Sequence, residues 1–441
     1  MTMPSLDGLH PQLREARVEG ARRPKLLFFA WNFPPVQAVA SLRTWNIAKY
    51  LTRSGWDVTV VTPRLDLWRH VDNAEKVEVN IRTEGIQEIW TDHSWRFLNP
   101  SQLACSDQGL SWFTGGMCRQ LARMTGIDNG IGWVKAAERA CSRLEPGDVD
   151  LILGSGPPFS SFTLAEKLSK KLRRPYFLDY RDPLMVTDVI QPLRPIVLRR
   201  EARLLAGAAG VTTVSEAWAS TLDSRFNIGS KLKVVTNGYD AEEVNDIKPH
   251  EFGHFAVVYA GIFYPPERVI TPVLSALKRL ENQATSREWY FHYYGDHNQD
   301  VREEAARLGL AQRVKLHGRV PRSEALSAIR GANIAVVINS VFEEAPARIR
   351  GWIPAKLFEI IALGTPILMI APPGTDAETI ARASGPMGRF SGNDVLGIES
   401  FIEKLMAGCQ FERGNSDSFA WKHIGATFDA YLRSQLLSWQ R

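Results

Sequence analysis

Residues 351–366 read GWIPAKLFEIIALGTP and lead directly into the apolar run ILMIA. Proline suits the start of a helix, glycine suits its C-terminal end, and a further proline prevents its continuation. Pro354, Gly364 and Pro366 therefore predict a short helix followed by a buried strand. Because the first N–H groups of a helix lack partners and carry the positive end of its dipole, this helix start is suited to binding a diphosphate.

Two charged residues of this helix are candidate ligand contacts. Lys356, in the first turn, adds a positive charge at the expected diphosphate site. Glu359, three residues further on, could accept hydrogen bonds from both hydroxyls of a ribose. The alternative is that Lys356 and Glu359 form an ordinary exposed i, i+3 ion pair. The spacing alone favours the ion pair.

Apolar, strand-like runs alternate with helical stretches on both sides of this segment, which is the pattern of a parallel sheet wound with helices. The expected strands are KLLFFAW, DVTVVTP, DLILG, PYFLDY, VTTVS and KVVTNGYD in the first half, and FAVVYAG, WYFHYYG, RVKLHG, IAVVIN and PILMIAP in the second. The sequence therefore predicts an α/β protein with two doubly wound, Rossmann-like domains. Ligands of such sheets bind beyond the carboxyl ends of the strands, so we expect the two domains to face an interdomain cleft.

A polar segment, AEEVNDIKPHEFGH at residues 241–254, interrupts this rhythm and marks the domain boundary. We assign residues 24–240 to an N-terminal domain and residues 250–415 to a C-terminal domain. Residues 65–145 form an irregular insertion that contains five tryptophans. Residues 1–23 are expected to be a mobile tail, because they contain arginines but no long apolar core.

The composition is that of an ordinary soluble globular chain, with 441 residues of which 44% are hydrophobic and 23% charged. The net charge of +5 fits phosphate ligands or an anionic surface and is too weak to indicate nucleic acid as a partner. The four widely separated cysteines favour a reducing, cytoplasmic compartment. No apolar stretch approaches the roughly 20 residues of a membrane-spanning helix, so any membrane contact is expected to be peripheral.

Asp182 is the candidate acid–base residue of the first half. It lies in DYRDP, just past an expected strand end, where a carboxylate can orient or deprotonate a hydroxyl group. Equally, Asp182 could cap a turn before Pro183 or pair with Arg181. Arg43 is ambiguous in the same way, since it either contacts a ligand or simply lies on the first helix.

No metal site is expected. The D-x-D pair formed by Asp148 and Asp150 precedes a strand and should lie away from the carboxyl-end crevice. The histidines of the second half show no spacing typical of metal ligands.

Eight segments occur in an order that is specific for one family. They are LLFFAWNFPP with Arg43 following, SGPPFSSFTLA, PYFLDYRDP, VTTVSEA, VVTNGYD, VVYAGIF with Arg268 following, VKLHGRVPRSEA and IPAKLFEIIALGTPIL. With them the chain resembles, from about Lys25 to its C-terminus, the retaining glycosyltransferases of family four, which have the GT-B fold and include bacterial surface-polysaccharide transferases. The resemblance implies that the C-terminal domain holds a nucleotide-sugar donor and the N-terminal domain an acceptor. It also implies that residues 416–441 form a helix packing back on the N-terminal domain.

The resemblance implies roles for individual residues as well. Arg268 and Lys356 would stabilise the charge of the departing nucleoside diphosphate, and Asp182 would act on the acceptor. The residues expected on the donor side are Gly261, Arg268, Arg319, Val320, Lys356 and Glu359, with the base near Arg319 and Val320 and the ribose at Glu359. Those expected on the acceptor side are Arg43, Ser155, Arg181 and Asp182.

Three positions depart from the family pattern. The glutamate expected eight residues before Glu359 is replaced by Gly351, and many relatives carry an arginine where this chain has Ile262. The Gly-Gly pair that is common after the first strand is missing from the loop VQAVAS. Glu343 and Glu344 are candidates to replace the missing glutamate. These departures leave the donor sugar and the acceptor open.

The segment RPIVLRREARLL, at residues 194–205, combines apolar positions with four arginines. It fits a helix at a membrane interface, and it also fits an ordinary amphipathic helix packed on the sheet. The tryptophans of the insertion allow the same two interpretations.

The expected function is therefore a metal-independent, cofactor-free, retaining glycosyltransferase of surface-polysaccharide biosynthesis. It would move a sugar from a UDP- or GDP-linked donor to a glycan or lipid-linked oligosaccharide, in the cytoplasm or peripherally at the inner face of the cell membrane. Two alternatives stay open at this point: a nucleotide-sugar epimerase of the same fold, and a non-catalytic nucleotide-sugar-binding protein.

Overall fold

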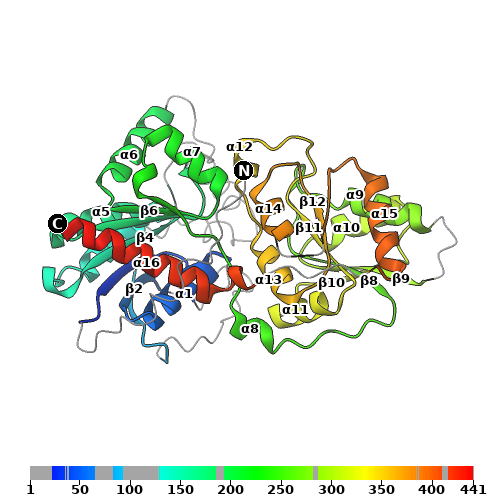
Figure 1. The fold of residues 1–441 in the computed structure, drawn as a ribbon, viewed down its shortest axis with the longest axis horizontal. Coiled ribbons are helices and arrows are strands. Elements are labelled where there is room, and N and C mark those ends of the chain that lie inside the picture. Colours follow the sequence, from blue (N-terminus) through cyan, green and yellow to red (C-terminus); the bar gives the residue numbers. More distant parts are fainter. Residues whose placement is uncertain are drawn as a thin grey trace, which may run out of the picture.

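Two parallel β-sheets, each covered by helices on both faces, lie side by side in the protein (Figure 1). This computed structural model describes residues 22–34, 36, 39–64, 83–92, 128, 130–184, 193–281, 287–383, 385, 387–409 and 416–440. The prediction of two doubly wound α/β domains is confirmed. The expected tail up to residue 21 and most of the insertion at residues 65–145 lie outside the described residues.

The N-terminal sheet has seven parallel strands in the order β3-β2-β1-β4-β5-β6-β7. These are β1 (Lys25–Ala30), β2 (Asp57–Pro63), β3 (Gln87–Thr91), β4 (Leu151–Gly156), β5 (Tyr176–Tyr180), β6 (Gly210–Thr213) and β7 (Leu232–Val234). Its helices are α1 (Val39–Arg53), α4 (Ile131–Ala140), α5 (Ser160–Leu172), α6 (Arg194–Gly207) and α7 (Glu216–Phe226). The sequence did not predict β3, an edge strand inside the insertion.

The C-terminal sheet has six parallel strands in the order β10-β9-β8-β11-β12-β13. These are β8 (Phe255–Ala260), β9 (Trp289–Tyr294), β10 (Val314–Gly318), β11 (Ile334–Ile338), β12 (Ile367–Ile370) and β13 (Met387–Phe390). The helices are α9 (Thr271–Glu281), α10 (Asn298–Arg307), α11 (Arg322–Gly331), α12 (Ala347–Arg350), α13 (Ala355–Leu363), α14 (Asp376–Ala383) and α15 (Val395–Met406). The short helix α8 (Ala241–Asn245) lies between the two sheets in sequence.

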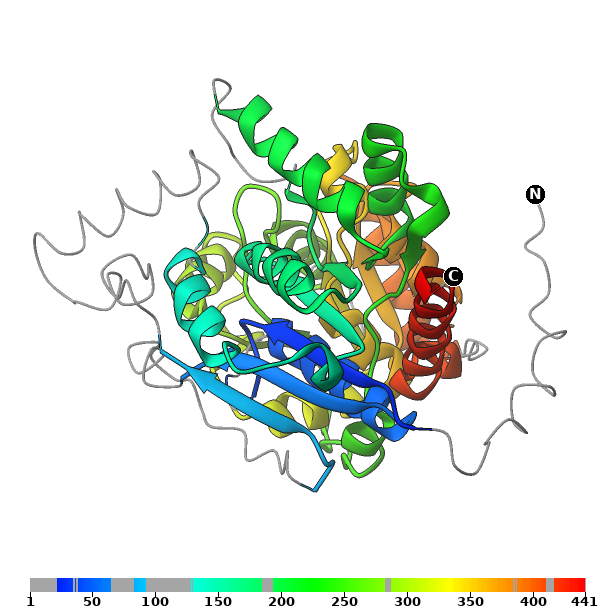
Figure 2. The same ribbon diagram turned by 90° about the vertical axis from the view of Figure 1, so that its left-hand side faces the viewer.

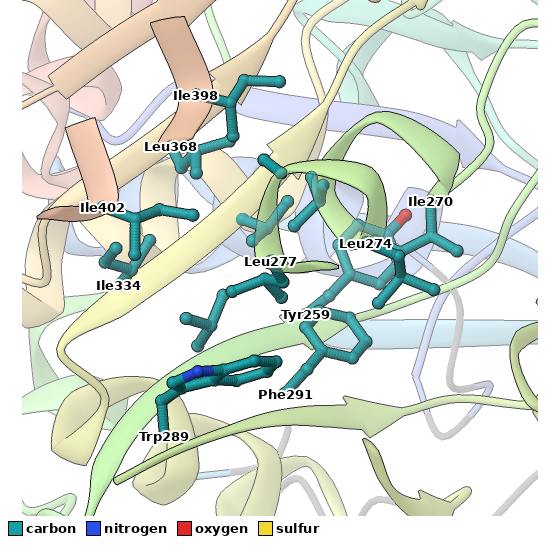
Figure 3. Close-up of a cluster of buried hydrophobic side chains, with 14 of the residues drawn as sticks. Tyr259, Ile270, Leu274, Leu277, Trp289, Phe291, Ile334, Leu368, Ile398 and Ile402 are labelled. Carbon is teal, nitrogen blue, oxygen red and sulfur yellow. The ribbon is translucent and has the colours of Figure 1, made fainter. Parts of the chain in front are cut away.

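Burial on both faces explains why the strands are continuously apolar. In β8, Phe255, Val257 and Tyr259 pack with residues of α9 and α15, a cluster shown in Figure 3. Ala256 and Val258 of the same strand pack on the opposite face with residues of α11, α13 and α14. A parallel sheet covered on both sides needs apolar side chains at nearly every position.

The last helix, α16 (Trp421–Gln440), crosses back onto the N-terminal domain and lies beside α1 (Figures 1 and 2). Its residues Phe428 and Leu432 are fully buried in the core that includes α1. The indole Nε1 of Trp56 donates to Asp429 at 2.6 Å. The first part of α16 thus belongs to the core of the N-terminal domain.

Parts of two features that the sequence left open lie in the core of the N-terminal domain. Trp133 of the insertion is fully buried in the core, and its Nε1 donates to Thr91 at 2.6 Å. In α6, Leu204 and Leu205 enter the same core, whereas Ile196 is 61% exposed. In the part of the chain that the structure describes, no helix is long and apolar enough to span a membrane.

Candidate functional site

Three glycines follow or end β8, β9 and β10, and backbone hydrogen bonds at these glycines connect the carboxyl ends of the three strands. Gly261 N donates to the carbonyl of Tyr294 at 2.8 Å, and Gly295 N donates to the carbonyl of Gly318 at 2.9 Å. Gly261 has a φ of +142°, and a Cβ there would lie 2.3 Å from Nζ of Lys356. Glycine is therefore needed at position 261, because Lys356 reaches across from α13 and lies directly on this backbone.

Helix α13 begins one residue later than its proline suggested. Pro354 is the N-cap residue and supplies no side-chain hydrogen bond to the helix, and Gly364 ends the helix with a φ of +71°. Lys356 is partly buried, and its Nζ lies 4.0 Å from the centre of the Tyr259 ring. Burial and the positive charge of Arg268 lower the pKa of Lys356 to about 7, and the charge of Glu359 opposes them.

Arg268 is the second cation at this place. Its guanidinium lies over two rings, 4.1 Å from the centre of Tyr264 and 3.8 Å from that of Trp352. Its Nε is buried and has no hydrogen-bond partner, and burial lowers the pKa of the group. Among the described residues, neither Arg268 nor Lys356 has a carboxylate within ion-pair distance. The site therefore carries positive charge that the protein itself does not neutralise.

Glu359 is held by an arginine that the sequence analysis did not single out. Its Oε1 accepts from Nε and Nη2 of Arg322, at 3.0 and 2.7 Å. Arg322 also donates to Glu243 of α8 at 2.8 Å. The side chain of Glu359 keeps 18% exposure. Glu359 thus pairs with Arg322 rather than with Lys356. Its side chain stays partly exposed on α13.

The two residues expected near a nucleotide base follow the β10 turn. Gly318 has a φ of +71°, which a glycine tolerates, and Arg319 lies next to it with its Nη1 3.6 Å from Asp296. Val320 packs at the edge of the core formed with α11 and α13. Their role in holding a base stays a prediction.

Arg43 and Ser155 belong to a buried network at the strand ends of the N-terminal sheet. Arg43 donates to both carboxylate oxygens of Asp179, at 3.1 and 2.6 Å. Ser155 Oγ and Thr212 Oγ1 donate to the same carboxylate, each at 2.8 Å. Arg43 is 2% exposed and Ser155 1% exposed. This arrangement gives both residues a structural part, and their contact with an acceptor stays a prediction.

Arg181 and Asp182 follow β5 and are both partly buried. Burial raises the pKa of Asp182, and the charge of Arg181 opposes that shift. Burial lowers the pKa of Arg181 to about 10, and its Nε is buried without a hydrogen-bond partner. A carboxylate whose pKa is raised binds a proton more readily, which suits the acceptor-side base expected of Asp182. Arg181 keeps donors available beside it.

Loops that follow β6, β11 and β12 meet where the two domains touch. Asp376 Oδ2 accepts from the backbone N–H of Ala217, in the first turn of α7, at 2.8 Å. Trp218 of α7 lies on Gly351, where a Cβ would come within 2.2 Å of the indole ring. The glutamate expected at position 351 has no space, because the other domain's tryptophan occupies it. These contacts also show that the carboxyl ends of the two sheets face each other.

Several of these neighbours were missed by the sequence analysis. Arg322, Tyr264 and Trp352 stand inside or beside the quoted motifs, but no periodicity or spacing marks them as partners of Glu359 or Arg268. Trp218 and Asp376 meet only through the packing of one domain on the other. A pattern along the chain carries no signal for such contacts.

Replacing Gly351 with alanine should loosen the contact between the domains. The added Cβ overlaps the ring of Trp218, and overpacking of this kind costs about 1–3 kcal/mol. We expect a lower melting temperature and a larger radius of gyration in solution scattering. Gly253→Ala is the matched control, because a Cβ at position 253 meets nothing within 4 Å.

The double variant Gly351→Ala with Trp218→Ala separates this explanation from a local backbone effect. It should regain the compact scattering profile because the clash is removed. A single Gly351→Ala variant that is as stable and compact as the unchanged protein would contradict the assigned contact.

Comparison with known proteins agrees with this geometry. Residues 40–238 match the model of the glycosyl transferase 4-like domain, and residues 254–389 match that of glycosyl transferases group 1. No curated protein sequence matches the chain.

Three solved structures illustrate the shared fold. HepE from Anabaena, solved with UDP and glucose, has 17% identity and a TM-score of 0.57, over 93% of this chain and 100% of HepE. Sucrose-phosphate synthase from Thermosynechococcus elongatus has 14% identity and a TM-score of 0.57, over 94% and 95%. The lipopolysaccharide outer core galactosyltransferase WaaB has 13% identity and a TM-score of 0.55, over 93% and 99%.

The two matched domains lie in the same order as the two sheets and cover most of the chain. With both domains present, and with the two-domain architecture of these structures, the chain is a glycosyltransferase of the GT-B fold.

Proposed function

We propose that the protein is a retaining, metal-independent glycosyltransferase that moves a sugar from a UDP- or GDP-linked donor to a glycan or lipid-linked acceptor during surface-polysaccharide assembly. The observation that carries the proposal is the pair of cations at the start of α13. Arg268 and Lys356 lie at the carboxyl end of the donor-side sheet without an ion-pair partner among the described residues.

A diphosphate fits this charge better than a single carboxylate. The charge of Arg268 contributes to the lowered pKa of Lys356, so the two groups are close enough to act on one ligand. The uncapped N-terminus of α13 adds backbone N–H donors. A guanidinium binds phosphate oxygens in a bidentate way and an ammonium adds a point charge. Glu359, one turn along the same helix, would accept the ribose hydroxyls.

The chemistry needs charge stabilisation more than a strong base. The bond between the anomeric carbon and the donor's phosphate oxygen breaks, and the nucleoside diphosphate leaves with the electron pair. Arg268, Lys356 and the α13 N–H groups would stabilise it, and contacts of this type are commonly worth about 3 kcal/mol each. The acceptor hydroxyl attacks the anomeric carbon on the face that the leaving group occupied. Its proton passes to Asp182 or to the departing phosphate.

The comparisons support the donor class and the setting. HepE is a structural neighbour solved with UDP and glucose, and WaaB is a neighbour that is a lipopolysaccharide outer core galactosyltransferase. We propose a cytoplasmic location with peripheral contact at the inner face of the cell membrane. The exposed Ile196, Arg199 and Arg200 of α6 form the surface that supports this contact.

A donor screen tests the proposal. UDP-, GDP- and dTDP-sugars are added to the protein, and the melting temperature is measured. One of them should stabilise the fold by about 2.7 kcal/mol at 100 times its dissociation constant. Glu359→Ala should lose most of this shift, whereas Glu304→Ala, which removes a partly buried partner of Arg307 on α10, should keep it.

Turnover then separates the three functions. Release of nucleotide only when an acceptor glycan is present supports the transferase. Conversion of the donor without acceptor identifies the epimerase, and binding without turnover identifies the non-catalytic protein. Activity that EDTA abolishes and added metal restores would refute the metal-independent mechanism.

The free protein should take up protons when it binds a nucleoside diphosphate. The pKa of Lys356 is lowered to about 7, and a bound diphosphate stabilises the charged ammonium and raises it again. At pH 8 the free amine is mostly neutral, so binding should take up nearly one proton; at pH 6 the amine is already charged and uptake should be small.

Calorimetry in two buffers of different ionisation enthalpy measures this number directly. Lys356→Met should abolish the uptake at pH 8. Equal uptake by the variant and the unchanged protein would show that the proton goes elsewhere.

A further inference from the structure

Two aromatic rings contact the guanidinium of Arg268, and no carboxylate among the described residues forms an ion pair with it. The guanidinium carbon lies 4.1 Å from the centre of the Tyr264 ring and 3.8 Å from that of the Trp352 ring. Tyr264 is 52% exposed, so its ring does not serve the packing of the core. An exposed tyrosine held over a partly buried arginine needs another explanation.

The two rings come from different loops that are tied together. Tyr264 and Arg268 exchange backbone hydrogen bonds of 3.0 and 2.9 Å, which closes the loop after β8. Glu267 in this loop accepts from Arg348 of α12 at 2.8 Å, and its carbonyl accepts from Val341 N at 2.8 Å. The loop that ends in Trp352 is thereby fixed against the loop that carries Arg268.

Trp352 is also fixed from its other side. Its carbonyl accepts from the side chain of Asn339 at 3.3 Å, and Asn339 is fully buried at the end of β11. The preceding residue, Gly351, lies against Trp218 of the N-terminal domain. The position of the indole therefore depends on both domains.

Stacking holds a guanidinium differently from a carboxylate. A ring attracts the cation through its face and fixes its plane, but it accepts none of the N–H bonds at the edge. A carboxylate would use those donors and cancel the charge. Contact with the faces of two rings therefore leaves N–H donors of Arg268 available for a bidentate anion.

We propose that Tyr264 and Trp352 are positioning residues that hold Arg268 edge-on to the diphosphate of the donor. This inference rests on the proposed function, since the ligand is the nucleoside diphosphate of that reaction. It assigns a part to two residues outside the expected donor and acceptor sets.

The test compares two ligands of the same site. Dissociation constants are measured for UDP, GDP and dTDP, and for the nucleoside of whichever one binds. Trp352→Leu should weaken binding of the nucleoside diphosphate roughly tenfold, as expected for loss of a desolvated cation–π contact, and leave the nucleoside nearly unchanged. Trp352→Phe, which retains a ring, should recover most of the loss.

Tyr264→Leu, at an exposed position, should act in the same direction and gives a second test if Trp352→Leu fails to fold. The matched control is Tyr290→Leu, at the amino end of β9 and so away from the carboxyl ends of the strands. It removes a ring whose centre lies 5.6 Å from the guanidinium carbon of Arg313. It should leave both ligands unaffected.

The outcomes separate the two proposals. An unchanged protein that binds none of the three nucleoside diphosphates refutes the proposed function. Binding of the diphosphate that both leucine variants leave intact refutes the positioning role alone. Equal loss of nucleoside and diphosphate, or a phenylalanine variant no better than leucine, also overturns it.

Discussion

Two basic groups, Arg268 and Lys356, lie next to each other without a carboxylate partner among the described residues, and the geometry of the donor side follows from this constraint. Lys356 lies over the ring of Tyr259 and against the backbone of Gly261. Arg268 lies over the rings of Tyr264 and Trp352. Burial lowers the pKa of both groups, and the positive charge of Arg268 lowers that of Lys356 further. Aromatic faces offset part of that cost while leaving the charge available. An anion that contacts both groups offsets the repulsion between Arg268 and Lys356. Relief of this unfavourable interaction therefore contributes to ligand binding.

The same region is connected to the contact between the domains. Gly351 precedes Trp352 and lies under Trp218 of the other domain, and Asp376 holds the first turn of α7. On the connecting side, Glu242 of α8 pairs with Lys49 of the N-terminal domain, and Glu243 pairs with Arg322, the partner of Glu359. The candidate phosphate contact is thus connected to the domain contact through Trp352 and Gly351. The candidate ribose contact is connected to it through Arg322 and α8. A change in the angle between the domains would therefore affect both the phosphate contact and the ribose contact.

The sequence predicted the parts that depend on local order. Strands such as FAVVYAG and ILMIA were recognisable because burial on both faces makes them continuously apolar, and Pro354 and Gly364 marked α13 to within a residue. Strands β3 and β13 were missed because they lie at sheet edges and include polar residues or glycine. The sequence also marked Arg268, Lys356 and Glu359, but it did not show what each touches. Arg43 and Ser155 illustrate the limit: their types suit a ligand site, yet their atoms are used inside the domain by Asp179.

The central claim is that one diphosphate occupies the space at Arg268, Lys356 and the start of α13. A crystal structure of the protein with its nucleoside diphosphate tests this most directly. We expect phosphate oxygens within hydrogen-bond distance of the edge of Arg268, of Nζ of Lys356 and of the first backbone N–H groups of α13. A nucleotide bound elsewhere, with both cations still lacking an anionic partner, would contradict the account.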